Sequence, residues 1–226
     1  MINPRGGYKM GLGVMSTQDE KDKKLQKSQE FQKKIADEMK PFLDKIIKSP
    51  KTDISLVKET LEKSFVINRK RHELMEAIFE ANTSRDEEAT LTQQIHELFT
   101  YLGFVESLAS YYVDILVMLL VASGRDFHIE SMHDTPRINH AMSIEDLENS
   151  YTPLKTKLNF LKNNGLKLFV STIDTSLRND IAHFKFHLEN GKILLRKKPV
   201  HEAIRHSKWK IVNCINRTTS SLYFLA

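Results

Sequence analysis

Residues Leu102 to Ala122 read LGFVESLASYYVDILVMLLVA, and the second half of this stretch is apolar nearly all round. A helix that is apolar on every side is buried, so the stretch predicts the central helix of a bundle. Its most apolar run, Tyr111 to Ala122, has 12 residues and contains Asp114. That is well short of the ~20 residues that a membrane-spanning helix needs. We therefore expect a buried core helix.

The same helix is predicted to start at Ser84, because the sequence Ser84-Arg85-Asp86-Glu87 matches a capping box. It would run to Ala122, with Gly103 as a weak point. At 100° per residue, one narrow polar stripe crosses its buried part, formed by Glu106, Ser107, Ser110 and Asp114. Buried carboxylates need partners, so either a polar group faces this stripe or the stripe is a rim exposed to solvent.

The composition is that of an ordinary globular protein, with 40% hydrophobic and 28% charged residues. The 8 glycines and 6 prolines leave little for long loops, which favours an all-α chain. The single cysteine, Cys214, cannot form an intrachain disulfide or a cysteine-based zinc site. The N-terminus has no continuous apolar segment of the secretory type. We expect a cytoplasmic protein without a membrane partner.

Charge is distributed unevenly along the chain. The net charge of +5 combines +2 for residues 1–90, −7 for residues 91–152 and +10 for residues 153–226. A basic C-terminal third would attract phosphate backbones or an acidic partner, although a solvated basic face explains it equally well.

The segments before the central helix divide into a tail and a helical extension. Residues 1–15 show no periodicity and are expected to be a disordered tail. Residues 16–83 are predicted to form an N-terminal helical extension, a hairpin of two helices over residues 17–82. One apolar stripe consists of Ile35, Met39, Phe42 and Ile46, and the other of Leu61, Phe65, Leu74 and Ile78. Pro41 is expected to kink the first helix or to start a new one. Its pattern is typical of a paired surface helix or a dimerising helix that carries no catalytic or binding residues.

After the central helix, Ser123 to Met142 reads as a connector with His128, His133 and His140, which are more typical of surface histidines than of metal ligands. A short helix is predicted over residues 143–149, and a second begins at Thr152-Pro153 and stops at Asn164-Gly165. A further helix should span residues 166–183. Asn190-Gly191 predicts a β-hairpin between residues 184–188 and 192–196, before a last helix over residues 201–224.

Three residues near the end of the 166–183 helix have the chemistry of a phosphate site. Arg178, Asn179 and His183 fit one helical face, since Asn179 and His183 are four residues apart. A guanidinium binds oxyanions in a bidentate way, and an imidazole moves protons near neutral pH. An arginine followed by a histidine with four to six residues between them is expected roughly 1.2 times by chance, but the fixed Arg-Asn-three residues-His pattern only about 0.02 times.

This motif, Arg178-Asn179-Asp180-Ile181-Ala182-His183, resembles the hallmark of the HEPN superfamily, the higher eukaryote and prokaryote nucleotide-binding domains. The resemblance extends over residues 84–226 and includes the long helix with its internal acidic residue, Glu106. It implies a HEPN-like helical bundle. It also implies a metal-independent endoribonuclease, often a toxin or antiviral effector, acting as a homodimer with both motifs in one cleft. Other members have lost activity and only bind.

The resemblance also implies residue roles. His183 would act as general base or acid on the ribose 2′-hydroxyl and the leaving 5′-oxygen, Arg178 would stabilise the phosphorane, and Asn179 would orient His183 or the phosphate. Glu106 or Asp114 would pair with Arg178. RNA-backbone contacts would come from Lys185, Arg196, Lys197 and Lys198. The partners would be RNA, a second copy and an antitoxin or regulatory protein, with no cofactor.

Two alternatives stay open at this point. In the first, the chain is a catalytically inactive HEPN-like module that binds RNA or a protein partner. Arg178 would then be bound to the acidic stripe, and His183 would only end a helix. In the second, His183 and His187 would hold zinc from one helix, although no HExxH glutamate accompanies them.

Overall fold

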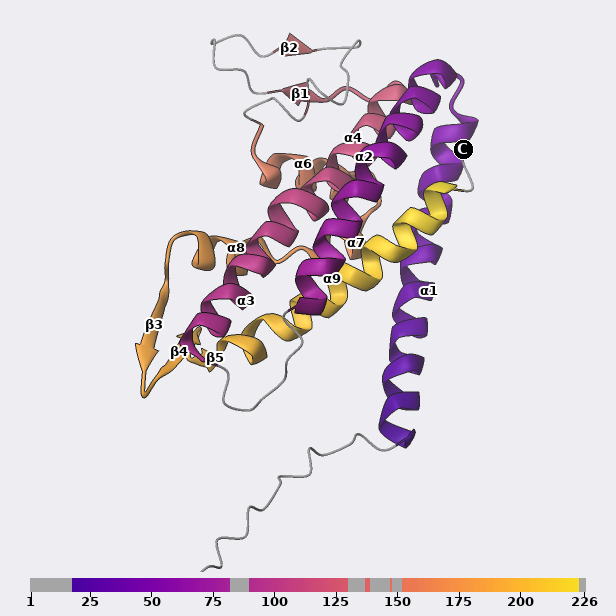
Figure 1. Ribbon diagram of the computed structural model, residues 1–226. Coiled ribbons are helices and arrows are strands. Elements are labelled where there is room, and N and C mark those ends of the chain that lie inside the picture. Colours follow the sequence, from indigo (N-terminus) through magenta and orange to yellow (C-terminus); the bar gives the residue numbers. More distant parts are fainter. Residues whose placement is uncertain (1–17, 82–89, 130–136, 139–146, 148–151, 224–226) are drawn as a thin grey trace, which may run out of the picture.

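The computed structural model describes residues 18–81, 90–129, 137–138, 147 and 152–223. Most of these residues are helical, and the helices pack side by side around a central one (Figure 1). The predicted helical fold is therefore confirmed at this level. The tail 1–15, the capping box at Ser84 and most of the short helix 143–149 lie outside the described residues.

The central helix has three parts: α3 (Leu91–Gly103), η1 (Phe104–Ala109) and α4 (Ser110–Ala122). It begins at Leu91 rather than at Ser84, because Thr90 is extended and forms a capping box with Gln93. The stretch from Leu91 to Ala122 is long and apolar enough to cross a membrane, but 83% of its most apolar window is buried inside the protein. It packs as the core helix of a soluble protein does.

Two long helices precede this centre in the chain: α1 (Gln18–Lys48), which packs mainly on the last helix, and α2 (Ile54–Ala81), which packs along α4 (Figure 1). The predicted stripe of α1 is buried, with Ile35, Met39, Phe42 and Ile46 at most 3% exposed. Pro41 neither ends α1 nor starts a new helix, because the residues before and after it are held in the same core. On α2, Leu61 is buried and Phe65 is half-buried, whereas the side chains of Leu74 and Ile78 lie outside the described part.

The predicted 166–183 helix is two helices, α7 (Lys167–Thr172) and α8 (Thr175–Ala182). The chain becomes extended at Ile173, and Asp174 caps α8 by accepting a 2.8 Å hydrogen bond from the Leu177 amide. The Asp174 carboxylate competes with backbone carbonyls for the amide N–H groups, and this separates α7 from α8.

The helix before them, α6 (Leu154–Asn163), starts one residue later than predicted. Pro153 has an extended ψ of 142° and occupies the cap position instead of the first turn. The stop after α6 is confirmed, since Gly165 adopts φ +110°.

A small antiparallel sheet precedes the last helix. Its strands are β3 (Phe186–Glu189), β4 (Lys192–Leu195) and β5 (Lys198–Pro199). The hairpin turn has positive φ at Asn190 and Gly191, as the Asn-Gly pair predicts, and β5 is an additional strand. The last helix, α9 (Val200–Tyr223), agrees with the prediction to within one residue. Two short strands, β1 (His128–Ile129) and β2 (Arg137–Ile138), pair in the connector, and His133 and His140 lie outside the described residues.

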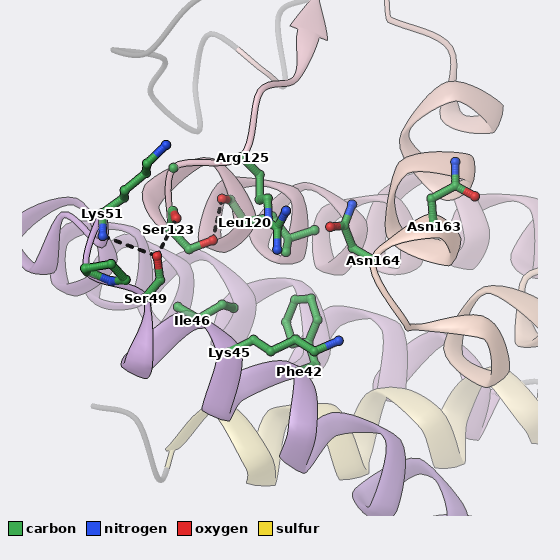
Figure 2. Close-up of a pocket in the computed structure, with 12 residues that line it drawn as sticks. Phe42, Lys45, Ile46, Ser49, Lys51, Leu120, Ser123, Arg125, Asn163 and Asn164 are labelled. Atoms are coloured by element: carbon green, nitrogen blue, oxygen red, sulfur yellow. Dashed lines mark hydrogen bonds between the residues drawn. The ribbon is translucent and has the colours of Figure 1, made fainter.

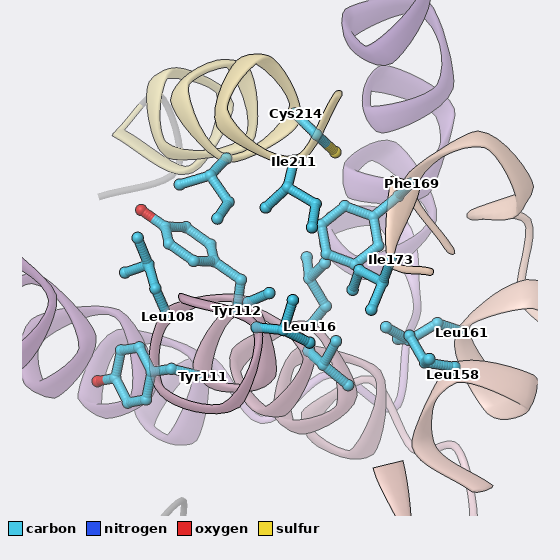
Figure 3. Packing of buried hydrophobic residues seen from close by; sticks show 14 of the residues in the cluster. Leu108, Tyr111, Tyr112, Leu116, Leu158, Leu161, Phe169, Ile173, Ile211 and Cys214 are labelled. Atoms are coloured by element: carbon cyan, nitrogen blue, oxygen red, sulfur yellow. The ribbon is translucent and has the colours of Figure 1, made fainter. Parts of the chain in front are cut away.

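One core joins the helices (Figure 3). Tyr112 and Leu116 of α4 face Phe169 of α7 and Ile211 of α9. Cys214 of α9 is 1% exposed, and burial raises the pKa of its thiol to about 12. The thiol is therefore a packing group rather than a nucleophile.

Helix α1 also holds the segment that leads into the motif helix. The Glu38 carboxylate accepts hydrogen bonds from the amides of Leu168 (2.6 Å) and Phe169 (2.8 Å) at the start of α7. At the other side of α1, the Gln32 amide donates to Asn213 of α9 at 2.8 Å. The 16–83 extension thus packs into the same core as the motif-bearing segment.

Replacing Glu38 with alanine is expected to lower the free energy of unfolding by about 1–3 kcal/mol, because two amides of α7 lose a charged acceptor. Urea unfolding followed by circular dichroism measures this change. The control is Glu30→Ala, since exposed Glu30 contacts Gln26 within α1 and should cost less than about 0.5 kcal/mol. Equal losses in both variants would contradict the bridging role of Glu38.

Candidate functional site

Arg178 is held by two neighbours on the surface of the bundle. Its Nε donates to Glu106 Oε1, and its Nη1 donates to Asn179 Oδ1 at 2.8 Å. The side chains of Arg178 and Glu106 are 32% and 40% exposed, so the pair faces solvent. A guanidinium has five N–H donors, and two are engaged here. Within the described residues the other three make no hydrogen bond, so they can receive an incoming anion.

Glu106 reaches Arg178 from a π-helical turn. The η1 segment Phe104–Ala109 follows directly after Gly103, the predicted weak point. A π-turn breaks the regular α-helical register, and such turns are frequent at functional sites. Glu106, in this turn, lies at the surface against α8, whereas Asp114, two turns further on, lies in the core.

Asp114 does not pair with Arg178. Its carboxylate lies 2.7 Å from Lys157 Nζ of α6, and the two side chains are only 6% and 9% exposed. Lys157 also donates to the Leu147 carbonyl at 3.3 Å. Both carboxylates of the predicted polar stripe thus face a cation, Glu106 at the surface and Asp114 in the core.

Arg196 lies in the turn between β4 and β5 and connects this turn to α8 by hydrogen bonds. It donates to Asp180 at 2.7 Å, to Ser176 at 2.8 Å and to Asp174 at 3.4 Å. The hydrogen bond and charge of Asp180 and the charge of Asp174 raise the pKa of Arg196, although desolvation opposes them. Through these contacts, Arg196 positions α8, the helix that carries Arg178 and Asn179.

The three lysines predicted to contact RNA differ in their surroundings. Lys185 lies 3.8 Å from Asp180, and Lys198 lies 3.0 Å from Glu202. Lys197 is exposed at φ +63°, and no contact of its side chain occurs within the described residues. Lys185 and Lys197 are thus the more accessible cations near α8.

His183 is the C-cap residue of α8, and its side chain is exposed. Within the described part of the chain, its imidazole makes no hydrogen bond or ion pair. His187 lies on β3 instead of on the same helix, and its Nε2 is 3.7 Å from Glu189. The pairing of His183 and His187 on one helix, which the zinc alternative needs, is therefore absent.

The residue after His183 has an unusual backbone. Phe184 adopts φ +53°, the left-handed region that bulky residues avoid. The amides of Phe184 and Lys185 bond back to Ile181 and Asp180 at 3.0 and 2.8 Å, which is a Schellman motif. Glycine is the usual residue at this position. The phenylalanine costs strain of order 1–2 kcal/mol, which indicates a role beyond helix termination.

Phe184 belongs to an exposed apolar surface next to the motif. Its ring is 65% exposed and lies 6.1 Å from Phe99 of α3 and 5.8 Å from Phe186 of β3, between ring centroids. On α3, Leu91, Ile95 and Phe99 follow one another at four-residue spacing, each about 40% exposed. We call these five side chains the apolar patch: Leu91, Ile95, Phe99, Phe184 and Phe186.

A buried tyrosine lies close to Asp174 and Arg196. Tyr101 of α3 is fully buried, and burial raises the pKa of its hydroxyl above the usual range. The hydroxyl therefore stays protonated at physiological pH and takes no part in proton transfer.

Sequence reasoning brought Arg178, Asn179 and Glu106 together correctly and missed Phe184 and Phe99. The left-handed backbone of Phe184 cannot be predicted from the composition or from the hydrophobic periodicity. Phe99 has the spacing of an ordinary apolar helix face. No family model, no curated protein and no solved structure matches this chain.

Proposed function

We propose that this chain is a metal-independent endoribonuclease that cleaves RNA by attack of the 2′-hydroxyl, in a site assembled from two copies of the α8 motif. The observation that carries the proposal is the arrangement at α8. Arg178 is oriented by Glu106 and Asn179 and, within the described residues, has three further N–H donors, and exposed His183 ends the same short helix five residues later. A fixed cation and an exposed imidazole on one helix suit phosphoryl transfer.

The reaction needs one base and one acid. His183 takes the proton of the 2′-hydroxyl, and the 2′-oxygen attacks phosphorus. Arg178 stabilises the negative charge that develops on the non-bridging oxygens. The bond to the 5′-oxygen breaks, and an imidazolium returns a proton to that oxygen. The products are a 2′,3′-cyclic phosphate and a 5′-hydroxyl.

A second copy supplies what one chain lacks. One imidazole cannot act as base and acid on opposite sides of phosphorus within the same step, so the second His183 would come from another copy. The apolar patch beside the motif is the surface that would bring it there, because a soluble monomer rarely exposes contiguous apolar surface next to a polar site. A two-fold contact through this patch would place both α8 helices together.

Phe184→Gly tests this contact. Glycine relieves the left-handed strain, so we expect the free energy of unfolding of the monomer to stay the same or rise by up to about 1 kcal/mol. Self-association should weaken at least tenfold, because the most exposed ring of the patch is lost. Sedimentation equilibrium measures this. Leu25→Ser, at an exposed position of α1 outside the patch, is the control and should associate like the wild type.

The rival is a catalytically inactive HEPN-like module that binds RNA or a protein. The ion pair of Arg178 with Glu106 favours it, because that carboxylate already satisfies one side of the guanidinium. The enzyme is favoured by the exposed His183 imidazole, which makes no hydrogen bond or ion pair within the described residues. An active enzyme of this kind would serve as a toxin or a defence effector in the cytoplasm, held in check by an antitoxin or regulatory protein.

Incubation of purified protein with mixed cellular RNA in EDTA, resolved on a gel, tests the function. We expect discrete fragments with cyclic phosphate ends. Binding of the same RNA in a gel-shift assay without any cleavage, at protein concentrations where the chain is dimeric, would favour the inactive module.

A further inference from the structure

A polar pocket lies at the far end of the central helix from Arg178. It has a volume of about 430 Å³ and lies where α1, α4 and α6 end (Figure 2). Seventeen residues separate Glu106 from Ser123 along the central helix, which corresponds to roughly 25 Å at 1.5 Å per residue. The pocket is thus remote from the motif of α8.

Among the described residues that line this pocket there are three cations and no carboxylate. Lys45 comes from α1, Lys51 from the turn after α1 and Arg125 from the loop after α4. Figure 2 shows Lys45 and Arg125 on facing walls with Asn164 beside them, and Lys51 at the other end next to Ser49. Within the described residues, none of the three cations forms an ion pair. By contrast Lys48, one turn along α1 from Lys45, lies 3.9 Å from Asp44.

The helix ends account for only part of this arrangement. Partial negative charge at three helix C-termini attracts positive side chains. Three carbonyls at the ends of α4 and α6 have other donors, however. Ser123 O accepts from Ser49 Oγ at 3.0 Å, Ala122 O from the Asp53 amide at 2.8 Å and Phe160 O from Asn164 Nδ2 at 2.9 Å. These carbonyls therefore do not use the N–H groups of the three cations.

Backbone geometry also shapes the pocket. Gly124 adopts φ +83°, and a Cβ there would stand 2.7 Å from Lys51 Cβ. Only glycine lets the Lys51 side chain pass this closely. The apolar part of the wall consists of Phe42, Ile46 and Leu120, each at most 4% exposed.

We propose that this pocket binds a small organic phosphate, with the phosphate between Lys45 and Arg125 and the organic part against Phe42 and Leu120. Guanidinium and ammonium groups are the usual phosphate ligands of proteins. A volume of about 430 Å³ exceeds what a phosphate ion needs and falls in the range of small-molecule sites. The proposal does not depend on the ribonuclease function.

The test uses phenyl phosphate as the probe, with phenol and inorganic phosphate as comparisons, on the full chain at pH 8. We expect phenyl phosphate to bind at least tenfold more tightly than either comparison, measured by titration of ³¹P or ¹H line widths. Arg125→Gln and Lys45→Gln should each weaken binding about tenfold or more, because each removes a charged hydrogen bond. Lys48→Gln removes one charge from the same end of α1 outside the pocket and should bind like the wild type.

Three results would overturn the proposal. The first is that Lys48→Gln weakens phenyl phosphate binding as much as the pocket variants do, which would indicate diffuse electrostatic attraction. The second is that phenol binds as tightly as phenyl phosphate, and the third is that the folded protein does not bind phenyl phosphate. Arg178→Ala should leave phenyl phosphate binding unchanged. If binding disappears in Arg178→Ala and persists in Arg125→Gln, the probe occupies the α8 site and the pocket proposal fails.

Discussion

His183→Ala is expected to lower the rate of RNA cleavage at least 100-fold, and up to about 10⁴-fold, because general acid–base catalysis contributes that much. In a two-copy site the substitution removes both imidazoles, the base and the acid. The side chain is exposed and makes no contact within the described residues, so folding should be unaffected. Single-turnover cleavage of a labelled RNA measures the rate, and thermal unfolding checks the fold.

His187→Ala is the matched control. His187 lies four residues further along, is exposed and contacts only Glu189 within the described part of the chain. Its loss should change the rate less than about threefold. Equal cleavage by the His183 and His187 variants would contradict the proposed site and indicate a contaminant or another centre.

Lys157→Met is expected to lower the free energy of unfolding by about 3–5 kcal/mol, because it leaves the buried Asp114 carboxylate without its cation. Asp114 and Lys157 are each under 10% exposed, and no solvent compensates. Urea or thermal unfolding, followed by circular dichroism, measures this loss.

Asp114→Leu combined with Lys157→Met should recover most of that stability, since replacing both charges of a buried pair with apolar groups is often neutral. Lys48→Met, at the exposed pair with Asp44, is the control and should cost less than about 1 kcal/mol. If Lys157→Met costs no more than Lys48→Met, the buried pair does not hold α4 to α6.

Much of the fold follows from local patterns that the sequence carries. The stripe of Ile35, Met39, Phe42 and Ile46 identifies the buried face of α1, because helical periodicity and burial coincide there. Asn190-Gly191 predicts the hairpin because both residues accept positive φ. The pairing of Arg178 with a carboxylate of the central helix could also be anticipated from the residue types.

The errors come from effects that local patterns do not encode. The sequence predicts a regular α-helix through Gly103, whereas the structure has a π-helical turn over Phe104–Ala109. Asp174 divides the predicted 166–183 helix because its cap bond competes with helix continuation, and Arg196 reinforces that cap from a distant turn. The positions of the π-helical turn and of the break between α7 and α8 depend on tertiary contacts.

The most direct measurement of the central claim compares two substrates in EDTA. One is an oligoribonucleotide containing a site that the protein cuts in cellular RNA, and the other carries a single 2′-deoxy nucleotide at that site. We expect cleavage of the first alone, with a 2′,3′-cyclic phosphate detected by mass spectrometry, because the 2′-oxygen is the nucleophile. Equal cleavage of both, or products with 3′-hydroxyl ends, would contradict a transesterification built on Arg178 and His183.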